Sequence, residues 1–562
     1  MLDLNKVKFI LGKQKIAYLY KLLFLILLGG LMDSLSVALI LPVLDIILLK
    51  KNFSLLNYEI NFTYFDYEKT IIIVLSTIII LYILKNFYLR FLLVKQTNFI
   101  SNMKAEISLK IYKKYIEFDQ IFFLRSNSAI FFRNLKSEAR IFVAYYLNSL
   151  LNLFLDSIFI FFLIIILASV DIFLFLICFF IFITASLIYF LFYKKYIAKI
   201  GANRQTLEGN EFKIIQETFR NIKEIKFYNA NNFFLNLYKK TVYSLAKYAA
   251  QFGIIAASLK YYFEIFLVFS LSIIIVFMVH KDYTQDQIIV TIGIFAAASV
   301  RLIPSINKII VALQNLRYSK KSLEEVYLIL SKQEEMAIQK QVIRQIKFFN
   351  EIELKNVSFQ YPEDKIPIIK NLSLKIKQGT IVGIFGKSGS GKTTLLNIIS
   401  GLLENYEGSI LSDQIDIKQN IFNWRSNFSY VTQNLNLNDT TIASNIAFGV
   451  ENELIDHDKL VNSSKFSKIF NFIDSLPKKF DSKVGELGSR LSGGEIQRIV
   501  IARAIYKGSK ILILDEATNS LNKEIEDEII SDLIKLKKNK ITILFSTHNL
   551  NLKKYFDQII EI

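Results

Sequence analysis

The chain of 562 residues contains a single cysteine, Cys178, and three histidines. A lone cysteine inside an apolar run excludes an internal disulfide framework and a cysteine-based metal site. Three histidines leave little for a histidine metal cluster. The apolar run from Leu19 to Leu49 lacks a clear A-x-A-like cleavage site and is too long for a signal peptide, so we expect a first membrane span there.

Hydrophobic residues make up 52% of the chain and aromatic residues 14%, with 49 Phe among them. The mean hydropathy is +0.36. These values are high for a soluble protein and ordinary for one that is partly immersed in lipid. The length exceeds what one hydrophobic core organises, so we expect two domains.

Further apolar runs are long enough to cross a bilayer, which brings the expected number of spans to six. They cover Ile71–Val94, Tyr145–Leu167, Ile172–Tyr193, Ile254–Val279 and Ile288–Leu313.

The net charge of +19 is typical either of a nucleic-acid-binding protein or of the cytoplasmic charge bias of a membrane protein. Residues 95–140 and 194–247 are rich in Lys and Arg, whereas the loops on the opposite side carry few. By the positive-inside rule both termini are cytoplasmic, and nucleic acid is not an expected partner. The Ile-, Lys-, Asn- and Phe-rich composition suggests an AT-rich bacterial genome, hence a bacterial cytoplasmic membrane.

Three segments beside the spans are also informative. Lysines mixed with apolar residues between Lys6 and Ile16 predict an amphipathic helix on the inner membrane surface. Helical periodicity in residues 95–140 predicts spanning helices that extend well below the membrane. The polar-aromatic segments Asp119–Ser128 and Gln216–Glu224 are natural contact points for a cytoplasmic domain. We divide the chain into a transmembrane domain (1–317), a linker (318–347) and a soluble α/β domain (348–562).

The soluble domain contains a phosphate-binding pattern. Gly386–Thr393 fits G-x-x-x-x-G-K-[ST] and follows the apolar run Ile381–Phe385, with a helix-forming segment after it. The glycines let backbone N–H groups surround phosphate oxygens, and the helix N-terminus favours negative charge. Lys392 would reach the β- and γ-phosphates, and the Thr393 hydroxyl would bind Mg²⁺. The sequence predicts a nucleoside triphosphate site.

Two further patterns suit phosphate chemistry. The apolar run Ile511–Leu514 ends in Asp515 and Glu516. In a neighbouring strand, Asp515 can hold Mg²⁺ through water, and Glu516 can polarise the attacking water. The segment Leu491–Arg498 places Ser-Gly-Gly at the start of a helix, where backbone N–H groups bind anions.

Residues 345–562 resemble the nucleotide-binding domain of ATP-binding cassette (ABC) transporters, since these motifs occur in the family's order. Tyr361 matches the aromatic residue on which adenine stacks, Gln433 a ligand of Mg²⁺ and water, and His548 the switch histidine that contacts the γ-phosphate. Glu486 resembles the residue of an exporter-specific loop that touches the intracellular helices. The resemblance implies the following ATP-binding residues: Tyr361, Gly386, Lys387, Ser388, Gly389, Ser390, Gly391, Lys392, Thr393, Thr394, Ser492, Gly493 and Gly494.

Two positions depart from the family pattern. Glu495 ends the signature where the family most often has Gln, a common variation. Asn522 replaces the Asp that helps couple the two nucleotide sites, and it keeps the size and an oxygen acceptor while losing the charge. We expect activity to survive both changes.

The resemblance implies a six-helix all-α transmembrane domain of the ABC exporter type, followed by an α/β P-loop nucleotide-binding domain. One such half-transporter should pair with a second copy of itself. ATP and Mg²⁺ would sit between the phosphate loop of one copy and Ser492–Gly494 of the other. Thr393, Gln433 and Asp515 would hold the metal, and Glu516 would act as the base with Gln433 and His548.

Ionisable residues at membrane depth are costly and are functional hypotheses by default. Lys85, Lys260 and Arg301 lie in three different predicted spans and would suit an anionic head group. The alternatives are internal pairing, for instance of Lys260 with Glu264, and side chains that snorkel to the membrane interface. Residues 298–308 resemble the sixth span of bacterial lipid-linked oligosaccharide flippases. Phe53–Lys69 resembles their short external helix, and an ordinary periplasmic loop is the alternative for this segment.

We therefore expect flipping of a polyprenyl-diphosphate-linked saccharide. Export of another lipid, a drug or a peptide remains open, because these membrane domains look alike. A channel or sensor that has lost hydrolysis is a further alternative, against which the intact ATP-site motifs argue.

Overall fold

The chain forms two compact units, one containing Met1–Phe118 and Arg125–Lys332, the other Asp119–Leu124 and Gln333–Ile562. The computed structural model describes residues 3–38, 53–55, 58–60, 67–332, 348, 350–362, 364, 366–387, 389–433, 435–518 and 523–562.

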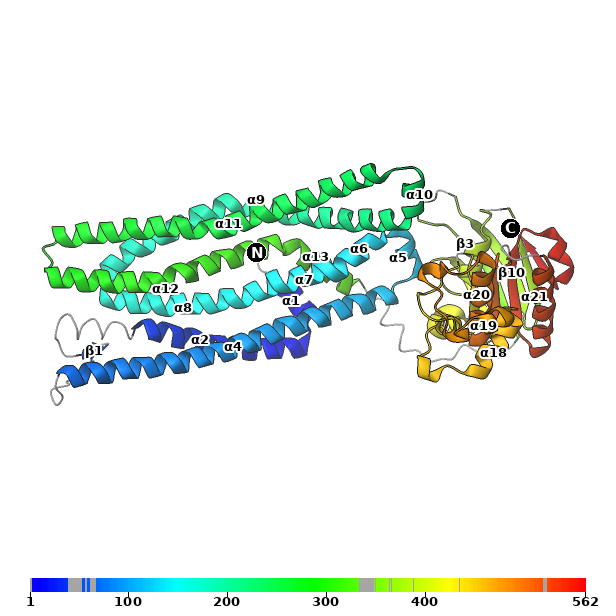
Figure 1. The fold of residues 1–562 in the computed structure, drawn as a ribbon, viewed down its shortest axis with the longest axis horizontal. Helices are drawn as coiled ribbons and strands as arrows, with labels where there is room; N and C mark the ends of the chain where they lie inside the picture. Colours follow the sequence, from blue (N-terminus) through cyan, green and yellow to red (C-terminus); the bar gives the residue numbers. More distant parts are fainter. Residues whose placement is uncertain are drawn as a thin grey trace. The chain divides into compact units, whose positions relative to one another are not determined.

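The first unit consists of long helices that run side by side (Figure 1). α9 packs on α11, and α8 packs on both α2 and α12. The elements are α1 (Leu4–Leu11), α2 (Lys13–Ala38), β1 (Phe53–Leu55), β2 (Tyr58–Ile60), α4 (Tyr67–Glu117), α6 (Ser128–Arg133), η2 (Asn134–Glu138), α7 (Ala139–Ile141), η3 (Phe142–Leu147), α8 (Asn148–Val170), α9 (Ile172–Arg220), α10 (Ile222–Phe227), α11 (Asn231–His280), α12 (Gln285–Tyr318) and α13 (Lys320–Ser331).

Three of these helices, α4, α9 and α11, contain 51, 49 and 50 residues. At a rise of 1.5 Å per residue each is about 75 Å long, more than twice the ~30 Å hydrocarbon core of a bilayer. Helices of this length extend well past the membrane, as the periodicity of residues 95–140 predicted.

Among the described residues, five helices are long and apolar enough to cross a membrane. They contain the described parts of the first five predicted spans. The sixth predicted span lies within α12, which is helical throughout but contains Pro304 and is not among the five. The protein is therefore a multi-pass membrane protein, and the count of six spans stays a prediction.

Local sequence explains where two of the long helices begin. The Asp171 side chain precedes α9 and accepts hydrogen bonds from the N–H groups of Phe173 and Leu174. Thr284 and Gln287 form a capping box at the start of α12. In both cases a side chain satisfies N–H groups that the first helical turn leaves without partners.

The expectation of an external helix in Phe53–Lys69 is wrong for the described residues before α4. β1 and β2 pair antiparallel, with Phe53 opposite Ile60 and Leu55 opposite Tyr58. Aromatic and aliphatic residues alternate here with Ser54 and polar positions, and this period of two favours strands. Residues 56, 57 and 61–66 lie outside the described part.

The amphipathic N-terminal helix exists as α1, but its apolar face is buried in protein rather than left for the membrane surface. Val7, Ile10 and Leu11 are at most 3% exposed. α1 packs on α13, where the rings of Phe9 and Tyr327 lie 5.3 Å apart. The short helix thus buries its apolar stripe against the last helix of the first unit.

A buried ionic cluster fastens α13 to the long helices. Glu138, fully buried at the end of the π-helical segment η2, accepts a hydrogen bond from Arg204 of α9 at 3.3 Å. Arg204 also reaches Glu208 at 3.1 Å, and Arg133 lies 3.7 Å from Glu325 of α13. Arg133 belongs to α6. Buried charges persist only when they are paired and hydrogen-bonded, so this cluster fixes how α6, η2, α9 and α13 meet.

The second unit is an α/β domain with two sheets (Figure 1). A parallel sheet has the strand order β11-β5-β10-β9-β8, and an antiparallel sheet has the order β4-β3-β6-β7. The strands are β3 (Glu351–Phe359), β4 (Ile369–Lys377), β5 (Ile381–Phe385), β6 (Glu407–Ser412), β7 (Ile415–Asp416), β8 (Phe428–Val431), β9 (Ile511–Asp515), β10 (Thr542–Thr547) and β11 (Gln558–Glu561).

Helices surround the strands of this unit. They are α5 (Gln120–Arg125), α15 (Lys392–Ile399), α16 (Ile421–Arg425), α17 (Ile442–Ile446), α18 (His457–Phe466), α19 (Phe470–Ser475), α20 (Gly493–Lys507) and α21 (Lys523–Leu536). Every residue of β5 and of β9 is buried, as expected for central parallel strands covered on both faces. Ile121, from the predicted contact segment Asp119–Ser128, is 6% exposed and joins this unit's apolar core.

Candidate functional site

The parallel sheet gathers the predicted residues at one edge. The phosphate loop follows β5, Gln433 follows β8, Asp515 and Glu516 end β9, and His548 follows β10. These strands are neighbours, and all are parallel. Because the carboxyl ends of parallel strands meet at one edge, residues far apart in sequence form one site there.

The phosphate loop turns tightly between β5 and α15. Gly389 and Gly391 have φ values of +82° and +103°, a region that L side chains rarely adopt. Gly391 is the residue before α15, so the loop opens directly onto a helix N-terminus. The first turn of such a helix leaves N–H groups without intrahelical partners, which suits an anion. Ser388 lies outside the described residues.

Lys392 is the first residue of α15 and is 5% exposed. Its ammonium group donates to the carbonyl oxygens of Gly386 and Lys387, both at 3.0 Å. It also lies 3.7 Å from Glu516 Oε1. The loop therefore holds a nearly buried positive charge beside the glycine turn, where the sequence predicted a phosphate contact.

Asp515 is 1% exposed and is held from several sides. Its Oδ1 accepts from Ser546 Oγ at 2.5 Å, and its Oδ2 accepts from Thr393 Oγ1 at 2.8 Å. The Tyr430 hydroxyl lies 3.4 Å from the same Oδ2. A buried carboxylate requires such donors, and they place it beside the Thr393 hydroxyl.

Glu516 adopts a left-handed backbone conformation with a φ of +51°. Its N–H group donates to Ser546 Oγ at 3.0 Å and to the Ser546 carbonyl at 3.2 Å. Its carboxylate accepts from Gln433 Nε2 at 2.9 Å. An unusual backbone held by named partners is typical of a functional position, and here it directs the carboxylate toward Gln433 and Lys392.

Two of the remaining predicted residues flank this centre. The Tyr361 hydroxyl lies 3.3 Å from Thr394 Oγ1 of α15, so its ring is half-buried beside the phosphate loop. His548 is exposed at the end of β10.

The signature segment forms a capped helix start. Ser492 precedes α20, and its hydroxyl accepts from the Glu495 N–H at 3.4 Å. Glu495 Oε2 in turn accepts from the Ser492 N–H at 2.7 Å. Either Glu or Gln completes such a capping box, which explains physically why Glu495 is tolerated. A Cβ on Gly493 would meet nothing within 4 Å, so the backbone here is open.

Sequence reasoning did not single out Tyr430, Asn397 or Ser546 as partners of the predicted residues. Tyr430 bonds Asn397 Oδ1 at 3.0 Å as well as approaching Asp515. Ser546 precedes the predicted Thr-His pair and bonds both Asp515 and the Glu516 backbone. Tyr430 and Ser546 lie near the ends of β8 and β10, which was the only signal for them, and nothing marked Asn397 within α15. Contacts between elements depend on register and packing, which the local sequence does not show.

The residues present fit a nucleotide with Mg²⁺. Thr393, Gln433 and Asp515 offer hard oxygen donors, which Mg²⁺ prefers. In the described part of the chain no group of three or more His, Cys, Asp or Glu side chains could hold a metal alone.

Comparison with known proteins identifies this domain. A family model described as "ABC transporter" matches residues 369–519. The chain carries an ABC transporter domain. This ABC transporter domain follows an N-terminal membrane domain, as the motif order and apolar runs predicted.

Relatives and a solved structure extend the likeness beyond the ABC transporter domain. An ATP-dependent lipid A-core flippase of Francisella tularensis subsp. holarctica is 32% identical over 381 residues, covering 65% of this chain and 60% of the relative. The flippase of the same description in Saccharophagus degradans is 31% identical over 370 residues, covering 65% and 61%. The chain thus spans about 60% of the length of these curated relatives.

The structure titled "Structure of a bacterial Atm1-family ABC exporter with ATP bound" has a TM-score of 0.78 and 20% sequence identity, and the match covers 97% of this chain and 93% of that chain. The chain therefore has the ABC exporter fold, with a helical membrane domain followed by an α/β nucleotide-binding domain.

Within the membrane domain, the predicted cations have different surroundings. Lys85 Nζ lies 3.2 Å from Asp33 Oδ1, with the two side chains 4% and 17% exposed. Lys260 is exposed on α11, and no ion pair within 4.0 Å joins it to Glu264, although both residues are described. Arg301 lies in α12, and its side chain is outside the described part. Lys85 is therefore internally paired, whereas Lys260 does not form the alternative pair with Glu264.

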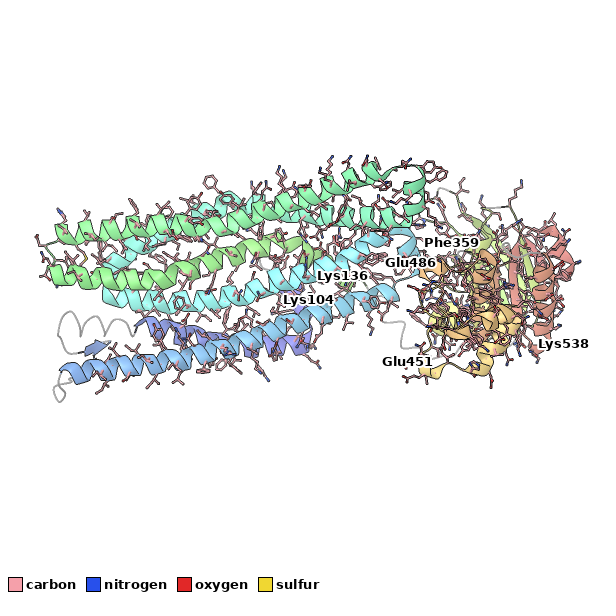
Figure 2. All side chains as sticks on the ribbon, in the orientation of Figure 1. Lys104, Lys136, Phe359, Glu451, Glu486 and Lys538 are labelled. Carbon is pink, nitrogen blue, oxygen red and sulfur yellow. The ribbon has the colours of Figure 1, made fainter. Side chains whose placement is uncertain are left out.

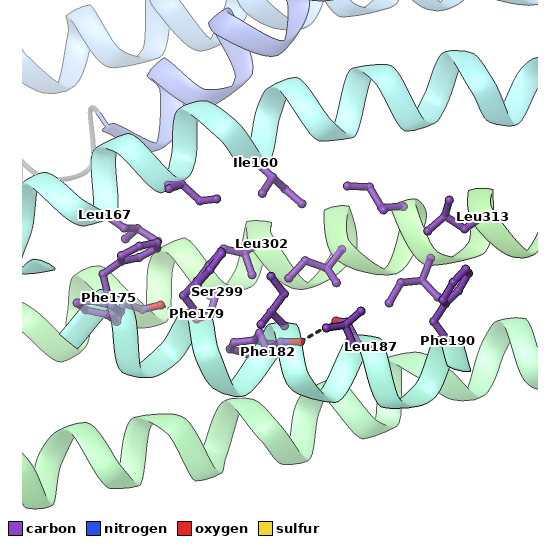
Figure 3. Close-up of a pocket in the computed structure, with 17 residues that line it drawn as sticks. Ile160, Leu167, Phe175, Phe179, Phe182, Leu187, Phe190, Ser299, Leu302 and Leu313 are labelled. Atoms are coloured by element: carbon purple, nitrogen blue, oxygen red, sulfur yellow. Dashed lines mark hydrogen bonds between the residues drawn. The ribbon is translucent and has the colours of Figure 1, made fainter. Parts of the chain in front are cut away.

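An apolar pocket of about 430 Å³ lies among α8, α9 and α12. Figure 3 shows Phe175, Phe179, Phe182 and Phe190 of α9 along one wall, with side chains of α8 and α12 along the others. Both serines in the lining donate their hydroxyls to carbonyls of their own helices, at 2.7 and 2.6 Å. The pocket surface is thus almost entirely hydrocarbon, which suits a lipid chain.

Proposed function

We propose that this protein is one half of an ATP-driven exporter that flips an anionic glycolipid across the bacterial cytoplasmic membrane. One observation carries the proposal: Lys392, Glu516 and Gln433 converge on the phosphate loop of an ABC transporter domain that is fused to a membrane domain. Nucleotide hydrolysis coupled to movement within the membrane is the activity that this combination supports best. The concentration of Lys and Arg between the spans supports cytoplasmic termini.

In this proposal the phosphate loop binds ATP through backbone N–H groups, and Lys392 contacts the β- and γ-phosphates. Thr393, Gln433 and Asp515 would hold Mg²⁺, which neutralises charge on the transferred phosphoryl group when bound. The Glu516 carboxylate accepts a proton from the attacking water. Its hydrogen bond from Gln433 orients it for this task.

The adenine ring stacks on Tyr361, and His548 contacts the γ-phosphate. Tyr361 follows β3 of the antiparallel sheet and reaches Thr394 beside the phosphate loop, and His548 follows β10 at the same edge of the parallel sheet as the loop, which supports these roles.

The active form in this proposal is a homodimer, because one chain carries one phosphate loop and one signature segment. Ser492–Gly494 of the second copy would close over the nucleotide. The capping box already fixes the start of α20, so its free N–H groups are oriented for an anion before the copies meet. Glu486 is exposed on the surface of the ABC transporter domain, as its proposed contact with intracellular helices requires (Figure 2).

We propose a polyprenyl-diphosphate-linked saccharide as the substrate. The hydrocarbon pocket among α8, α9 and α12 would receive part of the lipid chain (Figure 3). Lys85, Lys260 and Arg301 would contact the diphosphate, since Lys and Arg are the side chains that bind phosphate most strongly.

A glycolipid of the lipid A-core type is the second candidate, and the names of the matched relatives favour it. Both candidates join phosphate groups to hydrocarbon chains and sugars, so one site chemistry serves either.

Stimulation of ATP hydrolysis distinguishes the two substrates. Purified protein in nanodiscs is titrated with a polyprenyl-diphosphate oligosaccharide or with lipid A-core, and the half-stimulating concentration is measured. The proposal predicts that the first lipid stimulates at lower concentration and that Lys260→Ala raises the value. Lys281→Ala, an exposed lysine just after α11, is the matched control. Stimulation by lipid A-core alone would replace the proposed substrate with the second candidate.

A further inference from the structure

The Asp515 carboxylate has a neighbour that the described mechanism does not use. The Tyr430 side chain lies between two elements. Its hydroxyl is 3.0 Å from Asn397 Oδ1 on α15 and 3.4 Å from Asp515 Oδ2 at the end of β9. This hydroxyl thus contacts both the helix that follows the phosphate loop and the strand that leads into Asp515 and Glu516.

A phenol hydroxyl has one hydrogen to donate and lone pairs with which to accept. It cannot donate to Asn397 and Asp515 at once. Turning the Asn397 amide by 180° brings its NH₂ group to the phenol oxygen and leaves the phenol hydrogen for Asp515. In that arrangement Asn397, Tyr430 and Asp515 form a relay of donors that ends on the carboxylate.

A phenol has an ordinary pKa of about 10 and therefore keeps its hydrogen at neutral pH. A phenolate beside a buried carboxylate would bring two negative charges together, which the interior disfavours. The hydroxyl is therefore a fixed donor toward the carboxylate.

Asp515 Oδ2 is also the oxygen that accepts from Thr393 Oγ1. The geometry points to Tyr430 as a positioning residue that holds the Asp515 carboxylate in the orientation that Mg²⁺ requires beside the Thr393 hydroxyl. This inference rests on the ATP and Mg²⁺ site proposed above. Removing a residue that orients a metal ligand typically weakens metal affinity by about 10- to 100-fold.

Tyr430→Phe tests the inference because it removes one oxygen and keeps the ring. The matched control is Tyr406→Phe, since Tyr406 is 6% exposed and its buried hydroxyl has no hydrogen-bond partner among the described residues. The full-length protein is saturated with adenylyl imidodiphosphate, a non-hydrolysable ATP analogue, and titrated with Mn²⁺. Free Mn²⁺ is followed by electron paramagnetic resonance, and binding of the analogue alone is measured in EDTA.

Tyr430→Phe is expected to weaken Mn²⁺ binding by about tenfold and to leave analogue binding in EDTA within a factor of about two. Tyr406→Phe is expected to change neither. A Mn²⁺ affinity within about twofold of wild type, or an equal loss of analogue binding in EDTA, would overturn the inference. Asn397→Ala provides a second variant, with a smaller shift in the same direction. A wild-type protein that retains neither analogue nor Mn²⁺ would instead refute the proposed ATP site itself.

Discussion

Glu516→Gln is the substitution that separates hydrolysis from nucleotide binding. The Glu516 carboxylate accepts from Gln433 Nε2 at 2.9 Å and lies 3.7 Å from Lys392 Nζ. A glutamine fills the same volume, and its amide oxygen can keep the hydrogen bond from Gln433. What it cannot do is accept a proton from water. A general base contributes about 10²- to 10⁴-fold, so the barrier to hydrolysis should rise by about 2.7 to 5.4 kcal/mol.

The assay for Glu516→Gln has two parts. Phosphate release gives the turnover rate, and fluorescence of trinitrophenyl-ATP gives nucleotide affinity, which should stay within about threefold of wild type (under about 0.7 kcal/mol). Glu495→Gln makes the same charge change in the same domain and is the matched control, because Gln completes the capping box equally well. Its turnover should stay near that of wild type. Turnover of Glu516→Gln at the wild-type rate would refute the role assigned to this carboxylate.

Three further predictions concern the rest of the chain. Glu138→Gln removes the buried negative charge that pairs with Arg204 and should lower the free energy of unfolding by about 2 to 3 kcal/mol, measured by chemical denaturation in detergent, whereas the exposed Glu217→Gln should change it by less than about 0.5 kcal/mol. Burial acts to raise the pKa of Asp532, but hydrogen bonds from two lysine ammonium groups outweigh it and hold the pKa below the usual value. Since its folded pKa is depressed, Asp532 stabilises the fold above the unfolded pKa of about 3.9 and loses this effect as pH falls through the folded pKa. The destabilisation caused by Asp532→Asn should therefore shrink between pH 6 and pH 3, and a constant difference would contradict the pairing. Asn522→Asp should change ATP hydrolysis by less than about threefold, or about 0.7 kcal/mol, and a larger change would show that the departure from the family pattern matters.

The ATP site was predictable because its chemistry depends on local patterns. A glycine turn after a buried strand, an acidic pair at a strand end and Ser-Gly-Gly at a helix start each encode their geometry in adjacent residues. The sheet then brings Gln433 and Glu516 together, and the sequence indicated this only through the order of the motifs. The partners Tyr430 and Ser546 come from neighbouring strands, so their contacts depend on register, which a single sequence does not reveal.

The membrane half was less predictable for a different reason. Apolar runs indicate spans, but they do not show which polar side chains meet. The Lys85–Asp33 pair joins α4 to α2, and nothing near either residue in the sequence marks the other. The N-terminal helix was predicted correctly as amphipathic, yet its partner proved to be α13. β1 and β2 lie where the family resemblance predicted an external helix. The alternation of apolar and polar residues in these two segments favours strands.

Translocation itself is the most direct test of the proposed function. Proteoliposomes that contain the wild-type protein or Glu516→Gln receive a fluorescent polyprenyl-diphosphate oligosaccharide, and ATP-dependent movement of the label between leaflets is followed by quenching. We expect movement with the wild type and ATP, and none with Glu516→Gln or without ATP. Equal movement in all three samples, or none in the wild type while it hydrolyses ATP, would contradict ATP-driven flipping of this lipid.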